Sequence, residues 1–195
     1  CGDLASILAN ALVDGEPMEQ LDQISYFIIT ATAGHDTTSA TISGGMKALL
    51  EHPDQLAKLR KHPELAKQAA KEMIRWVSPV RHMMRTSTED IVLRGKTIKA
   101  GDSLCLWYPS ANRDSDAIED PDTFDIERDN QNQLAFGFGG HMCLGQHLAI
   151  LEVELFFKEL LPRLSHIEFA ADPEWVQAIF VGGLKSMPVH YAFNS

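Results

Sequence analysis

The stretch Phe136-Gly137-Phe138-Gly139-Gly140-His141-Met142-Cys143-Leu144-Gly145 decides the fold of this 195-residue chain. Its glycines allow the backbone to approach a partner closely or to adopt a positive φ. Cys143 stands at the start of a segment predicted to be a long helix. The dipole at a helix N-terminus favours a thiolate over a thiol. The pattern therefore predicts that Cys143 is a metal ligand or a nucleophile.

Three kinds of site fit this loop. Phosphate binding by the glycines is weakly supported, because Met142 occupies the position where a dinucleotide-binding fingerprint has its last glycine. The spacing of His141, Cys143 and His147 allows a zinc site, but a fourth ligand is not evident nearby. A flat apolar partner suits the two phenylalanines that flank Gly137 better than zinc does. The third kind of site is a haem iron held by a single axial thiolate.

The loop resembles the haem-ligand signature of the cytochrome P450 superfamily, Phe-Gly-x-Gly-x-His/Arg-x-Cys-x-Gly, at every fixed position. Residues 33–37 (Ala-Gly-His-Asp-Thr) resemble the oxygen-activation motif of that family. Residues 72–75 (Glu-Met-Ile-Arg) resemble its Glu-x-x-Arg helix motif. Residues 124–128 resemble the loop segment whose arginine joins that pair, and residues 110–114 (Ser-Ala-Asn-Arg-Asp) are similar to a frequent bacterial variant. The motifs occur in the family's order.

The resemblance implies a mainly α fold with small β-sheets, namely the C-terminal, helix-rich half of the cytochrome P450 fold. Residues 1–195 would form the haem-binding portion of a single domain, and the N-terminal half would be absent from this chain. The chain opens with Cys1 rather than Met, so we expect the start of the gene product to be missing. The length is sufficient to bury a sizeable core.

Apolar periodicity predicts a helix from about Met18 to about Glu51 and a final helix from Leu144 to about Leu161. Because proline suits the first helical turn, Pro53 and Pro63 each restart a helix, the second over 64–77. Residues 109–133 show no period and are predicted to be irregular. The apolar stripe of the final helix is Leu144, Leu148, Leu151 and Leu155. Strands are predicted at 91–93, 97–98, 103–108, 167–169 and 189–191, with hairpin turns at Gly95 and Gly101.

By resemblance, Cys143 is the iron ligand, and Phe136, Gly137 and Gly145 belong to the haem-binding loop. Arg85 and His141 are expected to bind the haem propionates through charge-assisted hydrogen bonds. The implied cofactor is haem b (iron protoporphyrin IX), with dioxygen as co-substrate. The alternative for Arg85 is a surface arginine at the beginning of a strand.

Residues 33–37 lower helix propensity in the middle of the first long helix. Thr and Ser in such a segment can hydrogen-bond back to carbonyl groups and bend the helix. By resemblance, Thr37 is the alcohol that holds dioxygen or a water in a locally opened helix, and Asp36 is the acid that supplies protons. The alternative is a weak spot in a buried helix.

Glu72 and Arg75 are three residues apart and therefore lie on one helix face. An exposed pair of this kind would contribute little to stability. The resemblance adds Arg128 and implies a three-member clamp that holds the following loop under the haem. The alternative is a solvated ion pair.

Several segments are similar to the bacterial alpha-terpineol hydroxylase branch of the family: residues 33–39, 44–45, 110–114, 141–149 and 181–183. Such members take electrons from an iron–sulfur ferredoxin and its NAD(P)H-dependent reductase. The resemblance implies a monooxygenase acting on a small hydrophobic substrate, a monoterpenoid or an aromatic hydrocarbon. The candidate pocket residues, which could equally be core positions, are Ile29, Thr32, Ala33, Val80, Met83, Phe180 and Val181.

Composition restricts the other classes of function. The net charge of −10 weighs against broad nucleic-acid binding, which relies on Lys and Arg. No apolar run approaches the roughly 18 residues that span a membrane. Three widely spaced cysteines do not suggest a disulfide framework and indicate a cytoplasmic protein. A chain that binds haem only together with its N-terminal half, or that is noncatalytic, remains the alternative to an active enzyme.

Overall fold

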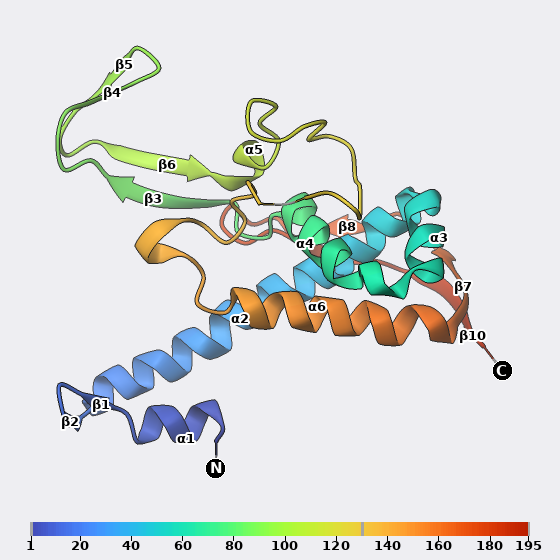
Figure 1. Cartoon of the computed structure of the whole chain (residues 1–195), viewed down its shortest axis with the longest axis horizontal. Coiled ribbons are helices and arrows are strands. Elements are labelled where there is room, and N and C mark those ends of the chain that lie inside the picture. The colour runs from blue at the N-terminus through green and yellow to red at the C-terminus, as the bar shows by residue number, and fades with distance from the viewer. Residues whose placement is uncertain (1, 130, 195) are drawn as a thin grey trace. The chain divides into compact units, whose positions relative to one another are not determined.

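The computed structural model describes residues 2–129 and 131–194. Its internal contacts divide the chain into two units, Cys1–Asp36 and Thr37–Ser195. The division falls within the long helix α2 (Gln20–Glu51), which begins two residues later than the sequence predicts. The described chain is mainly helical with small two-stranded antiparallel sheets (Figure 1), as expected.

The first unit holds α1 (Leu4–Ala9), the strands β1 (Leu12–Val13) and β2 (Glu16–Pro17), and the start of α2. Asp14 and Gly15 both have positive φ, 52° and 88°, which suits the two-residue turn that joins β1 to β2. The apolar side chains that predicted this part of α2 are exposed: Leu21, Ile24, Phe27 and Ile28. The spacing of these residues therefore predicted the helix correctly, but these side chains are not buried within the unit.

In the second unit, α2 is followed by α3 (Pro53–Lys61), η1 (Pro63–Leu65) and α4 (Ala66–Val77). Both proline restarts are confirmed, although the second begins with a 3₁₀ turn. Glycines let α2 approach α4 closely, because a Cβ added to Gly45 would lie 2.7 Å from the Met73 Sδ. A Cβ added to Gly44 would lie 2.6 Å from a Val77 methyl group. A side chain at either glycine would therefore force Met73 or Val77 to shift.

The helix α6 (Gln146–Leu160), with the 3₁₀ turn η3 (Leu161–Arg163), lies beside α4 (Figure 1). It buries Val153 and Phe157, whereas the four leucines of the predicted apolar stripe are exposed, and Leu144 lies before the helix begins. Both sides of the helix are apolar, so the period alone could not select the side that meets α4. The core around this contact includes Met46, Leu49, Leu59, Met73, Phe124 and Ile126.

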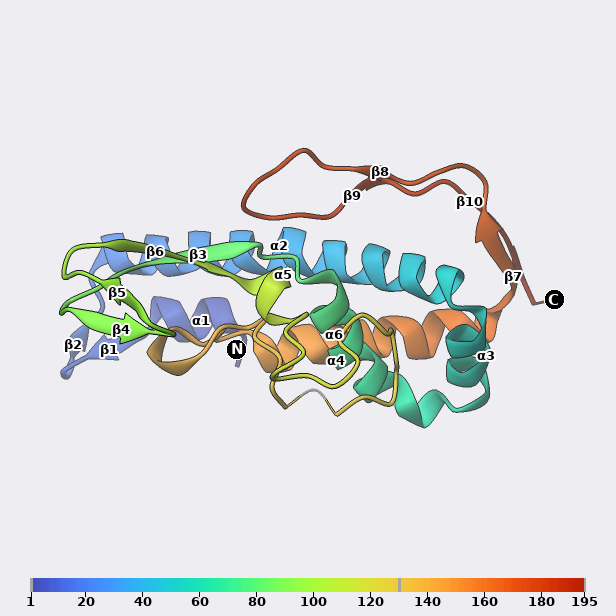
Figure 2. The same ribbon diagram turned by 90° about the horizontal axis from the view of Figure 1, so that it is seen from above.

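The strands form separate ribbons (Figures 1 and 2). After the β1–β2 ribbon, the next two pair β3 (His82–Thr86) with β6 (Ser103–Trp107), and β4 (Ile91–Leu93) with β5 (Lys96–Ile98). The others pair β7 (Leu164–Phe169) with β10 (Val189–Phe193), and β8 (Glu174–Trp175) with β9 (Leu184–Ser186). Figure 2 shows the β7–β10 ribbon at the C-terminal end of α6.

The two predicted hairpin turns have different outcomes. Arg94 and Gly95 have φ of 47° and 77° and join β4 to β5, as predicted. Gly101 is not in a hairpin turn, because β6 pairs with β3 instead of β5. The sequence pattern does not indicate β3, β8, β9 or the elements before α2, because periodicity is weak in segments this short.

The irregular region begins later than predicted, because Tyr108–Ala111 forms the short helix α5. The turn η2 (Gly139–His141) precedes α6, which begins at Gln146 instead of Leu144. Cys143 therefore lies three residues before the first helical residue. None of the helices in the described residues is long and apolar enough to cross a membrane.

Candidate active site

The cysteine loop, residues 134–145, is held by its own backbone. The Cys143 N–H donates to the Phe136 carbonyl at 2.9 Å, and the Gly137 N–H donates to the Leu134 carbonyl at 2.9 Å. Gly137 and Gly139 have φ of 71° and 70°, a region that side chains disfavour. The loop therefore needs these glycines for its shape, and it leaves the Cys143 thiol exposed.

Tyr108 of α5 supports the back of the loop. A Cβ added to Gly137 would lie 3.2 Å from the Tyr108 hydroxyl oxygen and 3.7 Å from the His141 carbonyl oxygen. Gly137 is thus required both by its φ and by this contact. Gly145 has an ordinary φ of −85°, and an added Cβ would meet nothing within 4 Å in the described residues. Within this chain, nothing in the structure requires glycine at 145.

The side chains around the thiol are mostly apolar and exposed. Phe138 is 81% exposed, Leu144 is 94% exposed, and Met142 is also exposed, whereas Phe136 is half-buried. Exposed apolar side chains gathered beside a functional group indicate a surface that another apolar group covers. His141, also exposed, lies on the same loop in η2.

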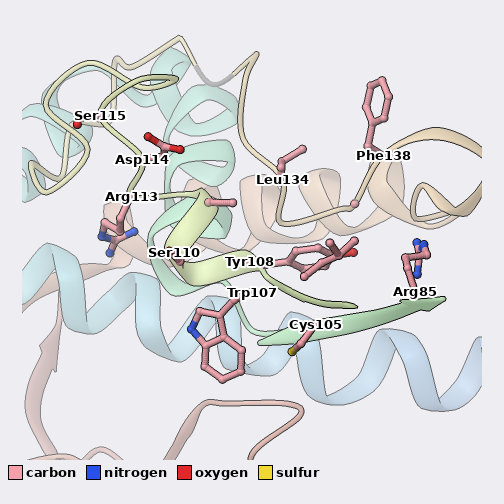
Figure 3. Close-up of a pocket in the computed structure, with 13 residues that line it drawn as sticks. Arg85, Cys105, Trp107, Tyr108, Ser110, Arg113, Asp114, Ser115, Leu134 and Phe138 are labelled. Carbon is pink, nitrogen blue, oxygen red and sulfur yellow. The ribbon is translucent and has the colours of Figure 1, made fainter. Parts of the chain in front are cut away.

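Arg85 lies on β3 and is half-buried. Its guanidinium donates to the Met84 carbonyl at 2.8 Å. Figure 3 shows Arg85 and Tyr108 on one side of the β3–β6 ribbon, facing the loop, while Cys105 and Trp107 point to the other side. A cavity of about 800 Å³ lies between β6, α5 and the loop, and its lining includes Arg85, Leu134, Gly137 and Phe138. Cys143 is not among its described lining residues, so the cavity adjoins the loop and not the thiol.

These residues fit a haem. One thiol offers a soft axial ligand, exposed apolar side chains suit a flat macrocycle, and Arg85 and His141 provide donors for two carboxylates. Zinc fits poorly, because no group of three or more His, Cys, Asp or Glu side chains in the described residues could hold a metal ion.

The structure brings Glu72 and Arg75 of α4 together in a bidentate ion pair. The Arg75 Nε and Nη2 donate to the two carboxylate oxygens of Glu72, each at 2.7 Å. Both side chains are 0% exposed, which excludes the alternative of a solvated pair. The guanidinium also donates to three carbonyl groups, those of Asn112, Pro121 and Thr123. Arg75 thus connects α4 to the irregular region that follows α5.

Arg128 completes the cluster from the loop side. Its Nε lies 3.4 Å from the Glu72 Oε1, and its other nitrogens donate to the carbonyls of Glu119, Asp120 and Thr123. The backbone N–H of Asp125 donates to the same Glu72 oxygen at 3.1 Å. A single buried carboxylate therefore holds two arginines and one backbone group of the loop.

The two candidate catalytic residues lie on α2, one in each unit. Asp36 is exposed and its carboxylate lies 2.8 Å from the His35 Nδ1, whereas Thr37 is half-buried. The Thr41 hydroxyl donates to the Thr37 carbonyl at 2.8 Å. The expected local opening is not seen, because α2 is regular across residues 33–38. Residues 33–36 are also exposed, which contradicts the alternative of a buried weak spot.

The structure brings three of the seven candidate pocket residues together. Val80 and Val181 form an antiparallel β-bridge, and the Arg81 N–H donates to the Phe180 carbonyl at 2.8 Å. Met83 and Arg85 lie two residues apart on β3 and therefore share one face of the strand. The remaining three, Ile29, Thr32 and Ala33, are exposed on the part of α2 that belongs to the first unit.

Sequence reasoning missed two buried polar residues beside the clamp, Ser78 and Asn112. They are 2% and 0% exposed. Residues 110–114 resemble a bacterial motif, but the resemblance alone gives no role to Asn112. A signal for Asn112 existed, since an amide within a recognisable motif and outside a regular element favours a specific backbone contact.

The comparisons identify the family. The cytochrome P450 family model matches residues 4–177, and the chain belongs to that family. Cytochrome P450-terp of a Pseudomonas species is 45% identical over 189 residues, which are 97% of this chain and 44% of the relative. Linalool 8-monooxygenase of Pseudomonas putida is 38% identical over 187 residues, 96% of this chain and 46% of the relative.

A solved structure agrees with this assignment. CYP108D1 from Novosphingobium aromaticivorans is 45% identical and superposes with a TM-score of 0.93, over 98% of this chain and 47% of that one. The chain thus spans about half the length of the relatives it matches.

Proposed function

We propose that this chain is the haem-binding portion of a cytochrome P450 monooxygenase. One atom of dioxygen would enter a C–H bond of the substrate and the other would leave as water, with two electrons and two protons consumed. The observation that carries the proposal is the exposed Cys143 thiol on a loop shaped by two left-handed glycines. The relatives whose names state a monooxygenase activity support the same reaction class.

The chain's own residues hold the cofactor in defined roles. Cys143 would ligate the iron of haem b, Arg85 and His141 would bind its propionates, and the exposed Phe138 and Leu144 would supply apolar contact to the macrocycle. The thiolate-ligated haem supplies the dioxygen chemistry, to which the sulfur contributes electron density. Asp36 carries protons towards the site and Thr37 holds the oxygen or a water by its hydroxyl.

The proposed substrate is small and hydrophobic, a monoterpenoid or an aromatic hydrocarbon. The bridge that joins Val80 to Val181 beside Phe180 supports it, because these side chains offer apolar contact without a charge. Linalool 8-monooxygenase acts on a monoterpenoid by its name, whereas steroid C26-monooxygenase, 39% identical, acts on a larger ring system. Spectral titration with a monoterpenoid and with a steroid separates these classes.

The proposed partner in the fold is an N-terminal half that precedes this chain, and the length of the relatives, about twice that of this chain, supports it. Two rows of apolar side chains support this, one on α6 and one on the first part of α2, both exposed in this chain. We expect the chain alone to bind haem weakly. The alternative is that this chain is a noncatalytic half that requires a second chain. Measuring activity after co-expression with the preceding half distinguishes this alternative from the proposed enzyme.

The proposed electron donor is an iron–sulfur ferredoxin with its NAD(P)H-dependent reductase, in the cytoplasm. The similarity to bacterial hydroxylases of this type supports the donor. Cys105 and Cys143, the free cysteines among the described residues, support a reducing compartment.

The test of the proposed function is the reduced carbon-monoxide difference spectrum of the chain joined to its preceding half. We expect the red-shifted Soret band of a thiolate-ligated haem. A haem-loaded protein without this band would contradict the thiolate assignment, and a protein that binds zinc and no haem would contradict the cofactor.

Thr37→Ala is expected to uncouple the reaction. Electrons would still be consumed, but oxygen would leave as hydrogen peroxide, because the hydroxyl that supports its protonation is lost. The measurement is product formed per NAD(P)H oxidised, in the complete enzyme with its ferredoxin. Thr38→Ala, the half-buried neighbour on α2, is the matched control and should remain coupled. Unchanged coupling in Thr37→Ala would return residues 33–37 to a purely structural segment.

Asp36→Asn is expected to slow the whole cycle while coupling stays closer to that of the unmodified enzyme. General acid–base groups contribute about 10²–10⁴-fold to rate, so the loss in turnover should be large. A solvent isotope effect on turnover that grows in the variant would identify proton supply as the affected step. Asp22→Asn, in the first turn of α2, is the control and should leave turnover unchanged. Normal turnover in Asp36→Asn would exclude this carboxylate as the proton donor.

A further inference from the structure

Asn112, at the C-terminal end of α5, is a buried amide whose side chain joins two distant segments. It is 0% exposed. Its Oδ1 accepts a hydrogen bond from the Leu134 N–H at 2.7 Å, and its Nδ2 donates to the Ser78 hydroxyl oxygen at 2.8 Å. Leu134 begins the cysteine loop and Ser78 ends α4. The amide therefore bridges the loop and the clamp helix.

On the clamp side, Asn112 is linked to Arg75 twice. The Ser78 hydroxyl donates to the Arg75 carbonyl at 2.7 Å, so its oxygen is oriented to accept from Asn112. The Arg75 Nη1 donates to the Asn112 carbonyl at 2.8 Å. Ser78 has a φ of 44° as the residue that caps α4. Any movement of α4 at Arg75 therefore reaches Asn112 through both its side chain and its backbone.

On the loop side, two further backbone hydrogen bonds lead from Leu134 to the cysteine. The Leu134 carbonyl accepts from Gly137, and the Phe136 carbonyl accepts from Cys143. The Tyr108 carbonyl, one turn before Asn112, accepts from the Asn112 N–H at 2.9 Å, and the Tyr108 hydroxyl occupies the space that a side chain at Gly137 would need. Asn112 is thus fixed on α5 while it holds the beginning of the loop that carries the thiol.

The chemistry of this position is specific for an amide. The Leu134 N–H requires an acceptor, and Ser78, which already donates to Arg75, requires a donor. Aspartate would keep the acceptor, lose the donor and place a charge in a fully buried position. Alanine would leave the Leu134 N–H and the Ser78 hydroxyl without this partner.

We propose that Asn112 is a positioning residue that couples the Glu72–Arg75 clamp to the cysteine loop and thereby sets the position of the Cys143 thiolate. The proposal rests on the proposed haem-thiolate function. Asn112 touches neither substrate nor cofactor in this assignment, and it acts through Leu134 and Arg75.

The experiment uses the chain joined to its preceding half, loaded with haem. The readout is the ratio of thiolate-ligated to thiolate-lost haem in the reduced carbon-monoxide spectrum, normalised to haem content, together with the iron reduction potential. We expect Asn112→Ala and Asn112→Asp to lower this ratio ~10-fold, because the first removes both hydrogen bonds of the amide and the second removes its donor and adds a buried charge. In Asn112→Ala, which adds no charge, the potential should also become more positive, because a displaced thiolate contributes less electron density to the iron. Ser78→Gly is the second variant. It keeps the left-handed cap and removes the hydroxyl, so the ratio should fall in the same direction.

Two controls separate positioning from loss of stability. Leu59→Ala removes a buried side chain from α3 and should lower the unfolding temperature while the spectral ratio stays unchanged. Asn132→Ala removes an exposed amide that donates to the Ala117 carbonyl and should change neither quantity. If Asn112→Ala does not load haem, the spectral ratio and the potential of Ser78→Gly test the proposal in its place.

A ratio and potential equal to those of the unmodified protein in haem-loaded Asn112→Ala, or in Ser78→Gly where the former does not load, would overturn the proposal. Absence of the thiolate band in the unmodified protein would instead overturn the proposed function. The two failures are therefore distinct.

Discussion

Cys143→Ala is expected to abolish thiolate ligation completely. The reason is the loop geometry: the Phe136 carbonyl holds the Cys143 backbone, and the glycines at 137 and 139 leave the thiol exposed. No second described cysteine lies on this loop, so no sulfur can replace it nearby. The measurement is the reduced carbon-monoxide spectrum of the chain joined to its preceding half, together with its haem content.

Cys105→Ala is the matched control for this result. Cys105 lies on β6, pairs with Met84 and points to the side of the ribbon opposite Arg85 (Figure 3). We expect no spectral change, and the same is expected for Cys1, which lies outside the described residues. A thiolate band that survives Cys143→Ala would show that the ligand assignment is wrong.

Glu72→Ala or Arg75→Ala is expected to prevent stable incorporation of haem. Both side chains are 0% exposed, and each variant leaves a buried charge without its partner, at a cost of about 3–5 kcal/mol. In Glu72→Ala, Arg75 and Arg128 lose the one carboxylate that they share. The region around residues 119–128 should loosen, because those arginines also hold its carbonyl groups. The measurements are haem per protein and the unfolding temperature.

The control is an exposed ion pair of similar length. The Arg163 Nη2 and the Glu159 carboxylate are 2.6 Å apart, and both side chains are largely exposed. Glu159→Ala should therefore change little, because water already solvates both charges. A Glu72→Ala protein that is folded, fully loaded with haem and only slow would indicate a catalytic role for the pair instead of a structural one.

The sequence motifs were sufficient to recognise the family. They were sufficient because each motif depends on the chemistry of its own residues and not on distant contacts. The loop from Phe136 to Gly145 matches a signature in which glycines and a cysteine must occupy fixed places. Its required backbone conformations at Gly137 and Gly139 are properties of those residues themselves. The helix restarts at Pro53 and Pro63 were predictable for the same reason, because proline fixes its own φ.

The pairing of strands that are far apart in the chain was harder to predict from the sequence. The sequence indicated a strand at 103–108, but its partner β3 was not predicted, and Gly101 was assigned to a hairpin turn that does not exist. The choice of a strand partner depends on contacts between segments that are far apart in the chain, and a local sequence pattern does not specify those contacts. The strand predicted over 103–108 ends at Trp107, because Tyr108 begins the short helix α5, where its hydroxyl lies beside Gly137.

By itself, the sequence determined the cysteine loop, the order of the motifs and the helices that carry Glu72, Arg75 and Thr37. Only the tertiary structure decided which face of α6 is buried, because both faces are apolar and burial depends on the position of α4. It also decided that the Glu72 carboxylate, which the resemblance had joined to two arginines, is fully buried and that Asn112 connects this clamp to the loop. Hydrogen bonds between residues 22 to 56 positions apart depend on where the packed helices place the backbone, and residue type alone does not specify that placement.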